Sequence, residues 1–139
     1  KTACAGADVR RDDWQTFLHD LVEAKMAEPF AWGSQDCVTF AAACIEAVTG
    51  SNPIAGIESW STERQALRRI VEMGGIEAWL DERYPRVQWH EAQRGDVALM
   101  EQKAGLVVVV NIGPGWVGPS ETGLTTSPPD AVQIAWRVE

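Results

Sequence analysis

The stretch from Phe30 to Phe40 reads Phe-Ala-Trp-Gly-Ser-Gln-Asp-Cys-Val-Thr-Phe, and the organisation of the fold follows from it. A loop of small and aromatic residues leads to Cys37, which opens an apolar segment that we expect to be a buried helix. Unpaired N–H groups and the positive end of the helix macrodipole stabilise a thiolate at such a position. The sequence therefore predicts that Cys37 lies at the start of a helix, a position where a nucleophile can be activated.

Apolar residues recur at helical spacing on both sides of this loop. We expect helices between Asp13 and Pro29, over 37–49, over 62–73 and over 76–84, with stops at Gly50, at Gly74-Gly75 and before Pro85. Asp12 and Asp13 are expected to cap the first helix, and Thr62 with Gln65 to form a capping box on the third. The spacing predicts that the third helix buries one face, made of Ala66, Leu67, Ile70 and Val71.

After Pro85 the pattern changes to short strands, expected at 87–89, 96–100, 106–112, 116–117, 123–126 and 132–138. No linker separates the helical half from the strand-rich half. The sequence therefore predicts an N-terminal segment, residues 1–11, followed by one α+β domain over 12–139.

Composition excludes several classes of function. The chain has 139 residues, a formal charge of −8 and a pI near 4.7, which disfavours nucleic acid and anionic membrane surfaces as partners. No apolar run reaches the ~18 residues that span a bilayer. Three cysteines, two of them two helical turns apart, and two scattered histidines predict no metal site, no disulfide between Cys37 and Cys44, and no cofactor.

Two groups of residues have an open role at this point. Cys4, in a Gly/Ala-rich segment, is either a free thiol or a ligand between chains. The seven tryptophans are either core residues or parts of a protein–protein contact surface, where tryptophan is enriched.

Trp32-Gly33-x-x-Asp36-Cys37 at a helix start, followed by Arg94-Gly95-Asp96-Val97 at the start of a strand, resembles the NlpC-type papain-fold cysteine peptidases. Thr49-Gly50, Gly74-Gly75 and the terminal Ala-Trp-Arg-Val of 135–138 make the chain most similar to small phage tail proteins of that fold. The resemblance covers residues 12–139 and implies a papain-like fold, with N-terminal helices packed on a C-terminal antiparallel sheet.

The resemblance also assigns positions to individual residues. Cys37 takes the place of the nucleophile, Asp36 precedes it, and Gly95-Asp96 open the strand before the catalytic histidine. In active members that histidine opens the next strand, where this chain has Gly105-Leu106-Val107-Val108. Leu106 occupies the histidine position or lies close to it. Without an imidazole, no group takes the thiol proton or returns it to a leaving amine.

The two histidines of the chain are the possible replacements. His90 is either an unconventional base for Cys37 or a loop histidine paired with Glu91. His19 is expected to be a solvated residue of the first helix. Cys37 itself is expected to be a packed, vestigial thiol, and Asp96 a residue of the turn or strand start.

These observations favour a structural or assembly protein of a phage tail tip or tail hub, with a degenerate cysteine-peptidase fold. Its partners would be other phage tail proteins in the virion, after synthesis in the host cytoplasm. The alternative is an active cysteine peptidase or amidase acting on peptidoglycan stem peptides, with Cys37 as nucleophile, His90 as base and the Cys37 N–H in the oxyanion hole. A pocket for an uncharged ligand at the vestigial site is a third possibility.

Overall fold

The computed structural model describes residues 10–103 and 105–139, so Cys4 and its role lie outside the described residues. The protein is an α+β protein, as the sequence predicts. The helices of the described part are α1 (Trp14–Lys25), α2 (Cys37–Thr49), α3 (Glu63–Glu72) and α4 (Ile76–Asp81). Two short 3₁₀ helices, η1 (Trp89–Glu91) and η2 (Pro129–Ala131), lie in connections.

In the part of the chain that the structure describes, six strands form one antiparallel sheet in the order β2-β7-β3-β4-β5-β6. Their bounds are β2 (Arg86–Val87), β3 (Val97–Gln102), β4 (Gly105–Asn111), β5 (Trp116–Ser120), β6 (Gly123–Ser127) and β7 (Ile134–Trp136). The hairpin of β3 and β4 is the longest pairing, running from Val97 opposite Val110 to Gln102 opposite Gly105.

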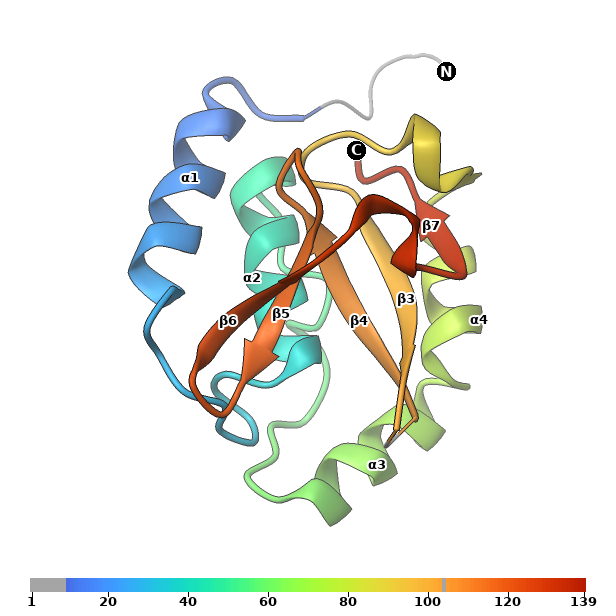
Figure 1. The fold of residues 1–139 in the computed structure, drawn as a ribbon. Helices are drawn as coiled ribbons and strands as arrows, with labels where there is room; N and C mark the ends of the chain where they lie inside the picture. The colour runs from blue at the N-terminus through green and yellow to red at the C-terminus, as the bar shows by residue number, and fades with distance from the viewer. Residues whose placement is uncertain (1–9, 104) are drawn as a thin grey trace.

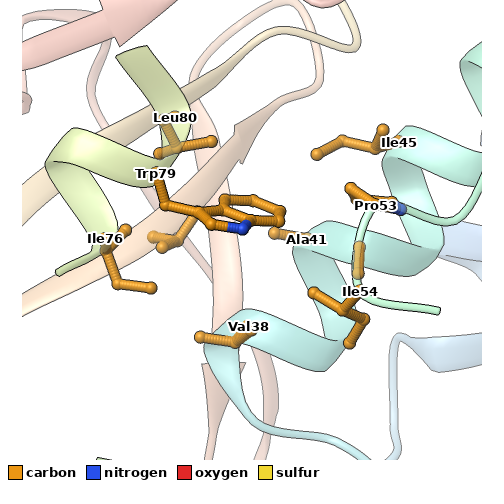
Figure 2. A pocket seen from close by; sticks show the side chains of 10 residues that line it. Val38, Ala41, Ile45, Pro53, Ile54, Ile76, Trp79 and Leu80 are labelled. Carbon is orange, nitrogen blue, oxygen red and sulfur yellow. The ribbon is translucent and has the colours of Figure 1, made fainter. Parts of the chain in front are cut away.

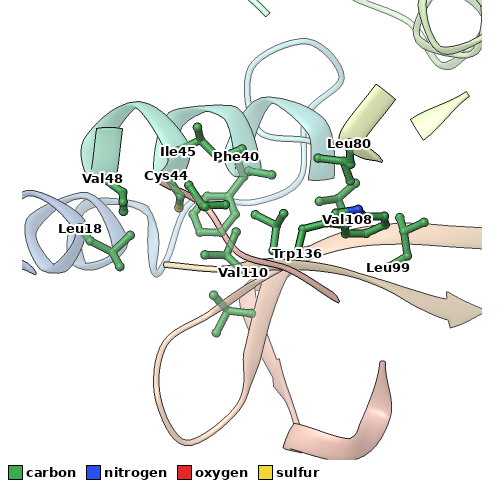
Figure 3. Packing of buried hydrophobic residues seen from close by; sticks show 14 of the residues in the cluster. Leu18, Phe40, Cys44, Ile45, Val48, Leu80, Leu99, Val108, Val110 and Trp136 are labelled. Carbon is green, nitrogen blue, oxygen red and sulfur yellow. The ribbon is translucent and has the colours of Figure 1, made fainter. Parts of the chain in front are cut away.

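The main core lies between α2 and one face of the sheet (Figure 3). Side chains alternate across a strand, so Val97 and Leu99 of β3 and Val108 and Val110 of β4 share this face. The first helix α1 packs on the outside of α2 (Figure 1) and contributes Leu18. The opposite face of the sheet carries a second cluster, made of Ala98, Met100, Val109, Trp116, Val132 and Ala135.

The seven tryptophans divide between the two expected roles. Trp116 and Trp136 are fully buried, and Trp60 and Trp79 are nearly so. Trp14 is partly buried against the core. Trp32 is 38% exposed and Trp89 is 42% exposed, so these two rings remain available to a partner.

The third helix differs from the sequence-based expectation. Ala66 is buried, but Leu67 is 55% exposed and Val71 is 76% exposed, and the charged Arg69 turns inward instead. The prediction of an apolar buried face was therefore wrong for two of its four residues. The helical spacing identifies the apolar residues of α3, but it does not identify which side of α3 faces the protein.

Several element ends also differ. Asp13 precedes α1 with a φ of 63° and makes no side-chain cap, so the predicted N-cap is not formed there. The strand expected at 132–138 pairs only over Ile134–Trp136. Arg11 N–H donates to the Val48 carbonyl at 2.9 Å, so the chain already joins the domain before residue 12.

None of the helices in residues 10–103 and 105–139 is long and apolar enough to cross a membrane.

Candidate functional site

The loop that leads to α2 is held by its own backbone. Ala31 and Gln35 pair in a short antiparallel bridge, with the Gln35 N–H donating to the Ala31 carbonyl at 2.8 Å. Between them, Gly33 has a φ of 82°, a conformation that residues with a side chain rarely adopt. A Cβ at this position would lie 1.7 Å from the Trp60 carbonyl oxygen. The glycine of the Trp-Gly motif is therefore required by the close packing of two backbone segments.

Asp36 is the N-cap of α2 and is only 2% exposed. Its Oδ1 accepts from the Thr39 N–H at 2.8 Å, and its Oδ2 accepts from the Gly33 N–H at 2.8 Å and the Trp60 indole N–H at 2.6 Å. The Thr39 side chain accepts the Asp36 N–H in return, which completes a capping box. The Asp36 carboxylate therefore joins the loop, the helix start and Trp60.

Cys37 is the first residue of α2 and is partly buried against the core. Burial raises the pKa of the Cys37 thiol, and the charge of Asp36 acts in the same direction. Backbone N–H groups of Val108, Cys37 and Val38 favour the thiolate, but they do not outweigh burial. The helix start places the sulfur as the sequence predicts, yet the surroundings keep it protonated at neutral pH.

The strand beside the sulfur is β4. Leu106, Val108 and Val110 share the face of β4 that is turned toward α2, because alternate residues of a strand point the same way. Val108 is buried there, whereas Leu106 is 57% exposed near the hairpin end. The side chains that β4 presents on this face are therefore aliphatic, and none of them can take up a proton.

Neither histidine of the chain is brought to Cys37. His90 lies in η1, exposed, with its ring edge-to-face against Trp89 at a centroid distance of 5.4 Å. Ala92, next to η1, packs on the face of the sheet opposite α2, and η1 lies at the other end of the molecule from the start of α2 (Figure 1, yellow). The geometry does not support His90 as the base of Cys37. His19 is exposed on α1, as expected.

Asp96 is fully buried, but it does not join Asp36 and Cys37 in one site. Its carboxylate accepts from Arg10 Nη2 at 2.8 Å, Arg137 Nε at 3.1 Å, the Val138 N–H at 2.9 Å and the Gln93 N–H at 2.7 Å. It precedes β3 at the end of the hairpin far from Leu106. Asp96 therefore bonds the segment at Arg10 and the segment at Arg137 and Val138 to the start of β3.

A pocket of about 40 Å³ lies beside the thiol. We call it the Cys37 pocket; it is lined by residues of the loop, the start of α2, the segment before α3, and α3 itself: Trp32, Asp36, Cys37, Val38, Trp60, Ala66, Arg69, Ile70 and Met73. A second hollow of about 20 Å³, on the other side of Val38, is enclosed by apolar side chains including Ala41, Ile54 and Trp79 (Figure 2). Only the first hollow combines a thiol, a charge and exposed aromatic surface.

Two residues of this pocket, Trp60 and Arg69, are not indicated as site residues by the sequence. Trp60 lies 24 positions after Asp36, with which it bonds, and no local spacing indicates that contact. Arg69 lies on a helix whose apolar pattern indicates the opposite orientation. The Asp36-x-x-Thr39 capping box, in contrast, has a spacing that can be recognised in the sequence.

The chain belongs to a protein family described as a domain of unknown function, DUF6950, whose profile matches residues 9–138. The match covers nearly the whole described chain, including the loop, the Cys37 pocket and the Asp96 cluster. No curated protein matches the sequence.

Proposed function

We propose that this protein is a non-catalytic, papain-like member of the NlpC-type superfamily and a structural component of a phage tail tip or tail hub. The observation that carries the proposal is the environment of Cys37. The cysteine occupies the start of a helix packed on an antiparallel sheet, as in a papain-like peptidase, but its pKa is raised and the facing strand presents only aliphatic side chains.

The hydrogen bonds of the loop support a structural role. The Asp36 carboxylate, next to the thiol, accepts from the N–H groups of Gly33, Thr39 and Trp60 and from the Thr39 hydroxyl. Its bonds stabilise the local fold and leave no acceptor for an imidazole. Two exposed tryptophans, Trp32 and Trp89, provide rings that can bury apolar area against neighbouring tail proteins.

The test is the composition and infectivity of the phage that encodes the chain. Mass spectrometry of purified particles is expected to find the protein in the tail. Phage carrying Cys37→Ala are expected to keep their titre, because the thiol takes part in no reaction, whereas Trp89→Ala is expected to lower it by weakening an interface. Absence from the particle would contradict the proposal, and a loss of titre caused by Cys37→Ala alone would favour the peptidase alternative.

A further inference from the structure

The outer side of α3 combines exposed aliphatic side chains with two arginines. Leu67 is 55% exposed and Val71 is 76% exposed, and Arg64 and Arg68 are also exposed. These four positions recur at i, i+3, i+4 and i+7, so they share one side of the helix, away from the buried Ala66. We call this surface the basic face of α3.

The two arginines of this face have no acidic partner in the described part of the chain. Neither Arg64 nor Arg68 forms an ion pair there, whereas Arg69 and Arg86 are each paired with two carboxylates. Like charges at i and i+4 of a helix repel each other. Because arginine next to apolar side chains is typical of protein interfaces, this face is suited to an acidic surface with an apolar centre.

The outer side of α1 is such a surface. Asp13, Asp20 and Glu23 are exposed and form no ion pair within the described residues. Phe17 is 42% exposed and lies between them, four positions after Asp13 and three before Asp20. The Arg11 guanidinium stacks on the Phe17 ring at 3.8 Å, and its one charge leaves the surface negative. We call this surface the acidic face of α1.

The two faces belong to different sides of the molecule. In Figure 1, α1 lies at the upper left and α3 at the bottom, with α2 near the centre. A contact between the two faces therefore joins two copies of the chain. Because the contacting surfaces differ, each copy in such a pair retains one unused face, and further copies can add to form a ring or an open chain.

We propose that copies of this chain associate head to tail, with the basic face of α3 in one copy bound to the acidic face of α1 in the next. The aliphatic side chains of α3 pack against the Phe17 ring, and arginine–carboxylate pairs surround this apolar contact. Contacts between two α1 faces or two α3 faces are disfavoured, because they bring like charges together. The inference does not rest on the proposed function, since it concerns the isolated protein.

The association is expected to be weak for a single contact. One helix pair of this length buries less than the roughly 1,200 Å² of a stable interface. The net charge of −8 also opposes the approach of two copies, although charges beyond about 8 Å are screened at physiological salt. Higher oligomers are therefore expected only at high protein concentration.

Sedimentation equilibrium of the full chain, at protein concentrations up to about 1 mM, tests the association. The weight-average mass is expected to rise above the 15.2 kDa of one chain and to pass twice that value, because each added copy offers another face. A constant mass of one chain would overturn the proposal. A mass that levels off at two chains would indicate a two-fold dimer and would also overturn it.

Charge reversal assigns the contact to the two faces. One variant carries Arg64→Glu and Arg68→Glu, and a second carries Asp20→Arg and Glu23→Arg; all four positions are exposed, and circular dichroism checks that both variants fold. Each variant alone is expected to associate at least tenfold more weakly than the natural chain, because its α1 and α3 faces have the same sign. An equimolar mixture is expected to associate again, since the reversed faces match each other. A mixture of folded variants that stays monomeric would contradict the proposal.

Matched controls separate the faces from overall charge. Lys103→Glu and Glu121→Arg change exposed charges in turns outside both faces and are expected to leave the association unchanged. Val71→Ser keeps the charge and removes an aliphatic contact, so it is expected to weaken the association severalfold. Equal effects of the controls and the face variants would show that no specific contact exists. Finding a monomeric protein in phage particles would refute self-association and leave the proposed function intact.

Discussion

Asp96→Ala is expected to remove a large part of the stability of this protein. The Asp96 carboxylate is fully buried and accepts four hydrogen bonds, two of them from the guanidinium groups of Arg10 and Arg137. Removing one partner of a buried ion pair leaves the other charge without compensation and costs about 3–5 kcal/mol. Small domains have total stabilities of about 5–15 kcal/mol, so a loss of this size leaves the fold marginal.

Arg10 makes the loss larger, since it also bonds to the Val138 carbonyl and the Arg94 carbonyl. Without Asp96, the segments at both ends of the described chain lose their common anchor. Urea unfolding followed by tryptophan fluorescence measures the effect, and Asp130→Ala, at an exposed position in η2, is the matched control with an expected change within about 0.5 kcal/mol. Equal midpoints for the two variants would show that Asp96 is not an anchor.

Gly33→Ala is expected to have the second largest effect. The new Cβ would lie 1.7 Å from the Trp60 carbonyl oxygen and 2.8 Å from its carbon. Both contacts are with backbone, which cannot move aside as a flexible side chain does. The positive φ of 82° adds strain for any residue with a Cβ. Separating the two segments also breaks the bonds that Gly33 and Trp60 donate to Asp36.

We expect Gly33→Ala to lower the free energy of unfolding by about 3 kcal/mol, the sum of backbone strain and lost hydrogen bonds. Gly56→Ala is the control, because a Cβ there meets nothing within 4 Å. It is expected to be neutral or stabilising by up to about 1 kcal/mol. Thermal melting compares the two, and the Trp60 indole N–H signal reports whether the Asp36 bond survives. Equal melting temperatures for the two variants would show that the Gly33 and Trp60 backbones do not approach each other closely.

Local signals in the sequence predict the parts of the fold that depend on neighbouring residues. The predicted bounds of α2 are confirmed, because Asp36 supplies a side-chain cap at one end and Gly50, with a φ of 87°, ends the other. The β-branched residues of 106–112 also predict β4, the long strand within the antiparallel sheet. These signals act over three or four residues, so a single sequence reveals them.

The remaining parts depend on contacts between distant residues. The orientation of α3, with Arg69 buried and Leu67 and Val71 exposed, is not determined by the spacing of its apolar residues. The position of His90 depends on which face of the sheet the segment before β3 crosses. The strand at the C-terminus is short because Arg137 and Val138 leave the sheet to bond with Glu91 and Asp96. No pattern within one segment determines these choices.

The central claim is that the Cys37 sulfur is not activated, and the pH dependence of its alkylation tests this claim most directly. Only the thiolate reacts with iodoacetamide, and burial raises the pKa of Cys37 above its ordinary value of 9.0. The reaction is measured on a Cys4→Ser background, where Cys44 is fully buried and protected. We predict slow labelling at pH 7 and a rate that still rises above pH 9. Fast labelling that is already constant between pH 6 and 8 would show an activated thiolate and contradict the account.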